Sequence, residues 1–234
     1  MKILVMPGGE FPPREQHKVG EVLTRLKNVG AEHWAVQAVM GGRLLPKYWL
    51  GWGSRARIDR VVKQTNRRIG EIHNVGGETD MVVTDYEYQP LDELVPAEHA
   101  AAVANVSRAV DAKSLYALGT DRHSKQWVRM LVEGCSFPIM AMPQYHYASR
   151  SGQPEDPTDD LKLCASLGIK AVPYVQGMIA GRAPRGIVTV SQLCKQLDRL
   201  ESLGVNRCIA WCDIRRDEAA GSIQRVIEAA GMVA

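Results

Sequence analysis

The sequence predicts an α/β fold built on a parallel β-sheet. Three observations lead to this fold class: β-branched apolar runs alternate with amphipathic stretches, glycines follow the amphipathic stretches, and this order repeats along the 234 residues. Short apolar runs are typical of buried strands, and apolar residues at spacings of three and four are typical of helices that pack on a sheet. Strands joined through helices run parallel, with right-handed crossovers.

Seven apolar runs are predicted as strands. They cover residues 2–7, 33–40, 81–86, 115–120, 137–145, 171–177 and 207–213. Between them, the helical spacing is clearest in two sets of residues: Val19, Val22, Leu23, Leu26 and Val29 in the first helix, and Leu193, Leu197, Leu200 and Leu203 in the sixth. Each of these helices has one apolar side, and we expect that side to cover the sheet.

The helix ends are also marked in the sequence. Glycines stand where a left-handed residue would close a helix, at Gly30, Gly168, Gly204 and Gly231. Thr158 and Asp217 stand where helix N-caps are expected.

Strand spacing favours a barrel over an open sheet. Strand starts are 22 to 36 residues apart, except for a gap of 48 residues that holds a basic helix and leaves room for one irregular strand. Eight strands would close a (β/α)8 barrel, whereas an open dinucleotide-binding sheet should show G-x-G-x-x-G after its first strand. Pro7-Gly8-Gly9-Glu10 is not that motif. We predict one TIM-like barrel domain over residues 1–234, with one strand missing or irregular.

Composition narrows the function classes. The chain is 45% hydrophobic, but no apolar run reaches the roughly 18 to 20 residues of a membrane span, so we expect a soluble protein without a membrane partner. A dispersed net charge of +3 does not predict nucleic-acid binding. The N-terminal apolar run is too short for a signal peptide, which predicts a cytoplasmic location unless lysis or a particle releases the protein. Five cysteines without a C-x-x-C pair predict reduced, mostly buried thiols.

Two carboxylates lie at the predicted carboxyl end of the third strand, the end where parallel barrels carry their active sites. Val83, Asp85 and Glu87 alternate, so the two acids share a face, which should be the barrel lumen, about 6.6 Å apart at roughly 3.3 Å per residue. Repulsion between them should raise the pKa of one and prepare it as a general acid. Such a pair suits glycosidic cleavage, although either acid could instead only bond an arginine or a loop amide.

Aromatic residues at the same strand ends predict a carbohydrate cleft. Rings stack on the C–H faces of sugars, while the polar atoms nearby bond their hydroxyl groups. The predicted substrate-binding residues are Trp49, Trp52, Tyr88, His146, Tyr147, Gln176, Trp211 and Asp213.

The segment from Asp80 to Glu87 resembles the D-x-x-D-x-D-x-E strand of family 18 chitinases, which are barrel-type glycoside hydrolases, with Val83 replacing the middle Asp. Met142-Pro143-Gln144-Tyr145 is similar to the Met-x-Tyr element of that family, and Ile209-Ala210-Trp211 to its final tryptophan. Asp85-Tyr86-Glu87-Tyr88-Gln89-Pro90 also resembles the D-x-E-Y-N-P segment of family 25 lysozymes, less closely because residues 2–7 lack the Asp expected there.

The family 18 resemblance implies a polysaccharide substrate that contains N-acetylated sugars. Glu87 would protonate the departing oxygen, Asp85 would orient and stabilise the substrate's N-acetyl group, and Tyr145 would hold its carbonyl. Because the substrate itself supplies the nucleophile, no second carboxylate nucleophile is needed. Val83 in place of the middle Asp leaves open a weakened or inactive descendant.

Two other functions stay open. One is a non-catalytic carbohydrate-binding or structural barrel within a larger assembly. The other is a metal-dependent sugar isomerase or aldolase-like barrel, in which His123 and His146 would meet Asp85, Glu87 or Asp213 across the barrel mouth. Since no H-x-H or H-E-x-x-H spacing is present, we predict neither metal nor cofactor. The sequence indicates no particular oligomeric state.

Overall fold

The computed structural model describes residues 1–39, 55–85, 110, 116–118, 139–141, 156–178 and 186–233. Their strands form two sheets, in which every pairing is parallel. The larger sheet has the order β3-β2-β1-β8-β7 and consists of β1 (Lys2–Gly8), β2 (His33–Val39), β3 (Glu78–Asp85), β7 (Tyr174–Val175) and β8 (Arg207–Asp213). The smaller has the order β4-β5-β6 and consists of β4 (Tyr116–Leu118), β5 (Ile139–Ala141) and β6 (Lys170–Ala171).

The first and last strands of the described fold are neighbours. β1 and β8 pair over the whole of both strands, from Lys2 opposite Arg207 to Gly8 opposite Asp213. In both sheets the neighbours otherwise follow chain order, as in a barrel. Within the ranges described, no pairing joins the two sheets, so the structure establishes a parallel α/β fold and leaves closure of the barrel as a prediction.

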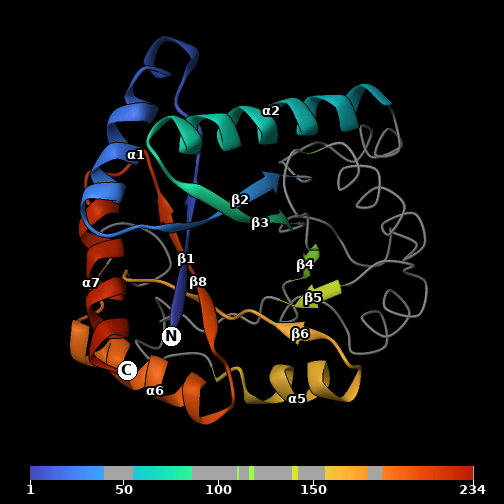
Figure 1. The fold of residues 1–234 in the computed structure, drawn as a ribbon, viewed down its shortest axis with the longest axis vertical. Coiled ribbons are helices and arrows are strands. Elements are labelled where there is room, and N and C mark those ends of the chain that lie inside the picture. The colour runs from blue at the N-terminus through green and yellow to red at the C-terminus, as the bar shows by residue number, and fades with distance from the viewer. Residues whose placement is uncertain are drawn as a thin grey trace.

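Helices cover one side of the larger sheet (Figure 1). They are α1 (Lys18–Asn28), α2 (Arg55–Asn74), α6 (Val190–Ser202) and α7 (Ala219–Met232), with a short 3-10 turn, η1 (Pro13–Glu15), before α1. The remaining helix, α5 (Thr158–Ser166), packs on β6 of the smaller sheet. α7 packs against both α1 and α6, and α2 packs on β2. In the part of the chain that is described, no helix is long and apolar enough to cross a membrane.

Alternation along the strands produces two apolar clusters. The cluster on the helix side joins strand residues such as Val5, Val36 and Val82 to helix residues such as Leu23 and Leu197. The cluster on the opposite face, called here the inner cluster, consists of Leu4, Met6, Ala35, Met81, Val83, Val172 and Ile209, with Tyr174 and Trp211 packed against it. Val83 therefore faces inward, as the sequence predicts.

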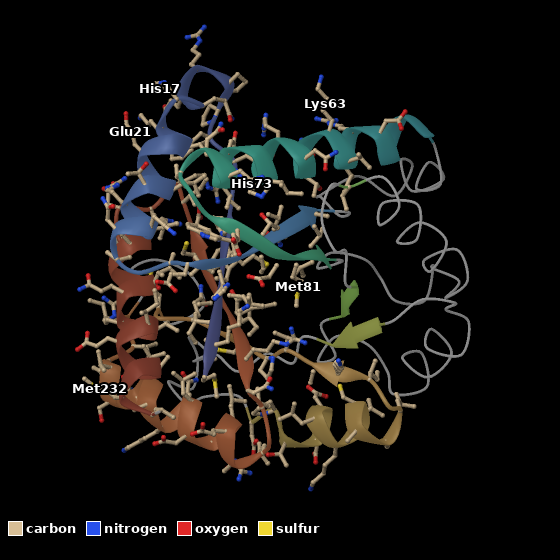
Figure 2. All side chains as sticks on the ribbon, in the orientation of Figure 1. His17, Glu21, Lys63, His73, Met81 and Met232 are labelled. Carbon is tan, nitrogen blue, oxygen red and sulfur yellow. The ribbon has the colours of Figure 1, made fainter. Side chains whose placement is uncertain are left out.

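Polar side chains stand on the outer surface of the helices. Figure 2 shows His17 just before α1, Glu21 on α1 and Lys63 on α2, and all three are exposed. Met81, labelled in the same view, belongs to the inner cluster. This distribution of polar and apolar residues is expected when each helix packs on the sheet with one apolar face and exposes the other.

Two predicted strands differ from the structure in their extent. The strand predicted at 81–86 begins three residues earlier, at Glu78. Residues 171–177 do not form a single strand: Lys170 and Ala171 pair with β5, whereas Tyr174 and Val175 pair with β8. The change occurs at Pro173, which has no N–H to donate to a ladder but accepts a hydrogen bond from the Ile209 N–H at 2.8 Å. The predicted strands at 115–120 and 137–145 are described only where β4 and β5 lie.

The predicted helix ends are partly correct. Gly30, Gly168 and Gly204 have φ values of 99°, 66° and 80° and follow α1, α5 and α6, which confirms their capping role. Gly231 instead lies inside α7, and that helix begins after Glu218 rather than after Asp217. Thr158 is the first residue of α5, not its N-cap, and donates its N–H to Asp156 Oδ1 at 3.0 Å.

Candidate functional site

Three of the predicted substrate-binding residues come together at the carboxyl ends of β7 and β8. Gln176, Trp211 and Asp213 line one small space, called here the strand-end recess. Its other lining residues are Met178, Cys212, Arg216, Ala219 and Ser222. The recess has a volume of about 10 Å³, which is the space of one water molecule or one hydroxyl group.

Asp213 is held by the residues that directly follow it. Arg215 donates from Nε to Oδ1 and from Nη2 to Oδ2, both at 2.8 Å, and its backbone N–H donates to Oδ1 at 3.1 Å. Arg216 Nε lies 3.7 Å from Oδ2. Burial by itself would raise the pKa of Asp213, but the hydrogen bonds from Arg215 and the two positive charges together lower it. Asp213 is therefore ionised at neutral pH.

Trp211 can lie across the end of β1 because residue 8 is a glycine. A Cβ at Gly8 would stand 2.7 Å from Trp211 Cε2, which no side chain could tolerate. Gly9 has a φ of 82°, and a Cβ there would stand 2.6 Å from Asp213 Oδ1. Gly8 and Gly9 therefore make room for the side chains of Trp211 and Asp213 on β8.

Ser222 is a site residue that the sequence prediction missed. It lies on the buried side of α7, is 1% exposed, and its Oγ has no hydrogen-bond partner in the structure. Gly177 packs so closely against it that a Cβ at position 177 would stand 2.8 Å from Ser222 Oγ. A signal for Ser222 exists in the sequence, since it is a polar residue at a position that the helical spacing of Ala219, Ile223 and Val226 assigns to the core.

Two arginines brace the backbone around this end of the sheet. Arg225 donates from Nη2 to the Gly177 carbonyl at 2.9 Å and from Nε to the Val188 carbonyl at 3.2 Å. Arg68, buried on α2, donates from Nη2 to the Gly9 carbonyl at 3.3 Å and has its Nε 3.0 Å from Glu71 Oε2. These contacts fix the positions of Gly177 and Gly9, on which the recess depends.

The structure does not describe the side chains of the remaining predicted site residues. Asp85 is the last residue of β3 and pairs with Val39, but its side chain is not among those described. The other residues all lie outside the described ranges: Trp49, Trp52, Glu87, Tyr88, Tyr145, His146 and Tyr147. Their roles therefore stay predictions.

Asp80, the first acid of the chitinase-like segment, lies far from the recess in the fold. Its Oδ1 accepts from Lys2 Nζ at 2.9 Å, and its Oδ2 lies 3.0 Å from His33 Nδ1. Asp80 also sits at an irregularity in the pairing of β2 with β3. It ties the amino ends of three strands together, and this is a structural role.

Of the five residues considered above as metal ligands, Asp213 is the one whose side chain the structure describes. Among the residues that are described, no group of three or more His, Cys, Asp or Glu side chains could hold a metal ion. Asp213, one of the ligands considered for a sugar isomerase, has both carboxylate oxygens bonded to Arg215. His123 and His146 lie outside the described ranges.

Comparisons with known proteins identify the fold. No family model and no curated protein matches the sequence. The chain is similar to a solved chitinase from Rhizomucor miehei, with 13% identity and a TM-score of 0.54 over 100% of this chain and 94% of the other. It is also similar to the homocysteine methyltransferase MmuM from Escherichia coli, with 14% identity and a TM-score of 0.51 over 98% of this chain and 96% of the other.

A third solved structure, an uncharacterized B. cereus protein, has 8% identity and a TM-score of 0.52 over 96% of this chain and 64% of its own. From these likenesses, the present 234-residue chain has a TIM-barrel-like fold. At such low identities the likeness concerns the fold alone, because the chitinase and the methyltransferase share it while carrying different chemistry.

Proposed function

We propose that this chain is a barrel-type glycoside hydrolase that binds and cleaves a polysaccharide containing N-acetylated sugars. The observation that carries the proposal is the convergence of Gln176, Trp211 and Asp213 on the strand-end recess. These residues come from two strands and meet at the end of a parallel sheet where barrel enzymes bind substrates. The fold likeness to a chitinase agrees with this reading without singling it out.

The side chains around the recess suit contact with a sugar ring that lies outside it, since the recess itself holds only about 10 Å³. Trp211 is half-buried against the inner cluster, so its ring is held in place and still offers surface to a ligand. Gln176 adds an amide that can both donate and accept hydrogen bonds. Asp213 has a lowered pKa, and its carboxylate accepts hydrogen bonds from Arg215. It is therefore ionised at neutral pH, so it holds Arg215 in place and does not supply a proton.

The proton for glycosidic cleavage comes, in this proposal, from Glu87. Asp85 orients the N-acetyl group of the substrate, and Tyr145 holds the carbonyl that attacks the anomeric carbon. Residues 1–234 then form one closed barrel domain. Val83, two positions before Asp85, belongs to the inner cluster and supports the placement of this strand end at the lumen.

The test is hydrolysis of a panel of labelled N-acetylated oligosaccharides. Glu87→Gln should reduce the rate by about 10²- to 10⁴-fold, which is the usual contribution of a general acid, while calorimetry shows that binding is retained. Glu32→Gln, at an exposed position before β2, is the matched control and should keep full activity. Unchanged hydrolysis by the Glu87 variant would contradict the proposal.

One observation favours a second candidate, a carbohydrate-binding barrel without turnover. Val83 is 0% exposed within an apolar cluster, at the position where the chitinase-like segment would carry its middle acid. An apolar residue there cannot pass a proton to Asp85. This candidate predicts that the wild-type protein binds the same oligosaccharides, and that no product forms during prolonged incubation.

A further inference from the structure

We propose that a groove at the amino end of the sheet binds a small organic anion, a carboxylate carried on an apolar body. The groove, called here the amino-end groove, is lined by α5, β6, the turn from α6 to β8 and the first residue of β8, and has a volume of about 370 Å³. It shares no lining residue with the strand-end recess. The inference is therefore independent of the proposed function.

The amino-end groove exists because β6 and β8 are not neighbours over their first residues. Lys170 and Ala171 of β6 pair with β5, and the chain reaches β8 only at Pro173, whose carbonyl accepts from the Ile209 N–H at 2.8 Å. Arg207 lies two positions before Ile209, so within the described fold no strand pairs with it on the side of β6. Because α5 packs on β6, the helix supplies the third wall of the space that this divergence leaves.

The walls combine apolar surface with access from solvent. Leu161 and Ile169 are half-buried and pack against the core, whereas Cys164 and Val205 are buried. Burial raises the pKa of the Cys164 thiol to about 12, so this part of the wall carries no charge at neutral pH. Ala165, which also lines the groove, is exposed. A ligand can therefore reach the apolar wall directly from solvent.

The charges of the amino-end groove favour an anion. Lys170 and Arg207 both line it, and none of the lining residues that the structure describes is acidic. No ion pair joins either cation to an acid of the described ranges. The acids on the adjoining helices, Asp160 on α5 and Glu201 on α6, are not among the lining residues. Two positive charges are thus available to a ligand.

The helix ends beside the groove oppose an anion, but more weakly. Both α5 and α6 end there, and a helix C-terminus carries about half a negative elementary charge. The N–H groups of Ile169 and Val205 donate to the carbonyls of Cys164 and Leu200 at 2.9 and 3.0 Å, which leaves fewer free carbonyl groups. The two helix ends together offset about one of the two positive charges, so the groove keeps a net positive charge.

The volume sets the size of the ligand. At about 30 Å³ per heavy atom, roughly the share of one water molecule in the liquid, a volume of about 370 Å³ holds about a dozen heavy atoms. This volume is near the lower end of the roughly 300 to 1,000 Å³ of ligand pockets. A carboxylate would contact Lys170 and Arg207, and its apolar body would cover Leu161 and Ile169. An inorganic phosphate would leave the apolar wall uncovered.

The test is an NMR titration of the isotope-labelled protein of residues 1–234. The ligands are 3-phenylpropionate, an anion of this size, and 3-phenylpropanamide, its neutral counterpart. The anion should bind with a Kd of about 1 to 10 mM, as expected of so small a ligand, and should shift the backbone N–H signals of the lining residues. The neutral counterpart should bind at least about 3-fold more weakly, because it lacks the charge that the two cations attract.

Variants of the lining residues locate the bound anion. Arg207→Gln and Lys170→Gln should each weaken its binding about 2- to 5-fold, the contribution of one partly exposed charge. Ala165→Trp fills the groove from an exposed position and should weaken binding by more than about 10-fold. Lys195→Gln, exposed on α6 and outside the groove, is the matched control and should bind as the parent protein does. Melting curves confirm that each variant is folded.

Four results would each overturn the site: no saturable binding of the anion, equal binding of the anion and its neutral counterpart, unchanged binding by both charge variants, or undiminished binding by folded Ala165→Trp. Should Ala165→Trp fail to fold, the two charge variants and the neutral ligand still decide. Hydrolysis of N-acetylated oligosaccharides does not involve this groove. Its loss would therefore overturn the proposed function alone, and failure of the anion to bind would overturn this site alone.

Discussion

The two ends of the same parallel sheet use their charged side chains differently. At the amino end, Lys2 on β1 and His33 on β2 both reach Asp80 on β3, so the ion pairs link different strands. At the carboxyl end, Asp213 pairs with Arg215, two residues away in its own loop. Charges that pair across strands fix the sheet, whereas charges that pair within a loop leave the space between strand ends available. The comparison agrees with the usual division of barrels into a stabilising and a functional face.

The largest expected effect is at the carboxyl end. Gly177→Ala would bring a Cβ against the backbone and hydroxyl of Ser222, so α7 must shift, and the free energy of unfolding should fall by about 1 to 3 kcal/mol. Urea unfolding measures the change. Gly70→Ala on α2 is the matched control, because no atom lies within 4 Å of its Cβ position, and it should gain about 0.5 to 1 kcal/mol. Equal effects of the two variants would contradict the close packing of β7 on α7.

A smaller effect is expected from Arg215→Gln. The lowered pKa of Asp213 makes its contribution to stability complete above the ordinary aspartate pKa of about 3.9, and that contribution is lost as the pH falls through the lower folded-state value. Without Arg215, burial would raise the pKa of Asp213. The variant should lose about 1 to 2 kcal/mol at pH 7, with Arg216 still present, and less at pH 3.

Urea unfolding of wild type and variant at both pH values tests this. Arg207→Gln, at the other end of β8, serves as the control and should show no such pH dependence. A loss that is the same at pH 7 and pH 3 would mean that Arg215 stabilises the fold by packing instead of by its charge.

Asp80→Asn tests the amino end. Its ion pairs are partly exposed, with side-chain exposures of 39% for Lys2 and 29% for Asp80, so the expected loss of stability is only about 0.5 to 1 kcal/mol. A double-mutant cycle with Lys2→Met isolates the coupling between the two residues. Ligand binding should stay unchanged, and a binding defect would contradict the division of roles between the two ends.

The smallest effect concerns two thiols on β8. Burial raises the pKa of both Cys208, near the amino end, and Cys212, near the carboxyl end, to about 12, so neither thiol reacts readily with iodoacetamide at pH 8. Because burial raises the pKa of both thiols in the same direction, each is labelled mainly when its surroundings open, and the two rates compare that local opening. We expect Cys212 to be labelled a few-fold faster than Cys208, and half-buried Cys194 to be labelled before either. Mass spectrometry of timed samples measures this, and faster labelling of Cys208 would reverse the comparison.

The parallel fold was predictable because its strands are apolar on both faces and its helices on one. Val83 and Trp211 follow from the same alternation. The break at Pro173 was foreseeable from the missing N–H, but the change of neighbour from β5 to β8 depends on a contact with Ile209, distant in sequence. Local spacing carries no information on such contacts.

The site was predictable only in part. Gln176, Trp211 and Asp213 were found because strand ends can be read from the sequence. Arg215 is only two positions from Asp213, so this ion pair could have been predicted from the sequence. Ser222 was missed because a single serine in an amphipathic helix is unremarkable until the space beside it is known.

The pairing of β1 with β8 bears on how the chain acquires its structure. Arg207 lies 205 positions after its partner Lys2, so one edge of the first strand stays without this partner until those residues have been synthesised. At a ribosomal rate of about 5 to 20 residues per second, that wait is about 10 to 40 seconds. Such a long-range contact makes folding slow, and a chaperone that shields this edge during translation would increase the yield of native protein.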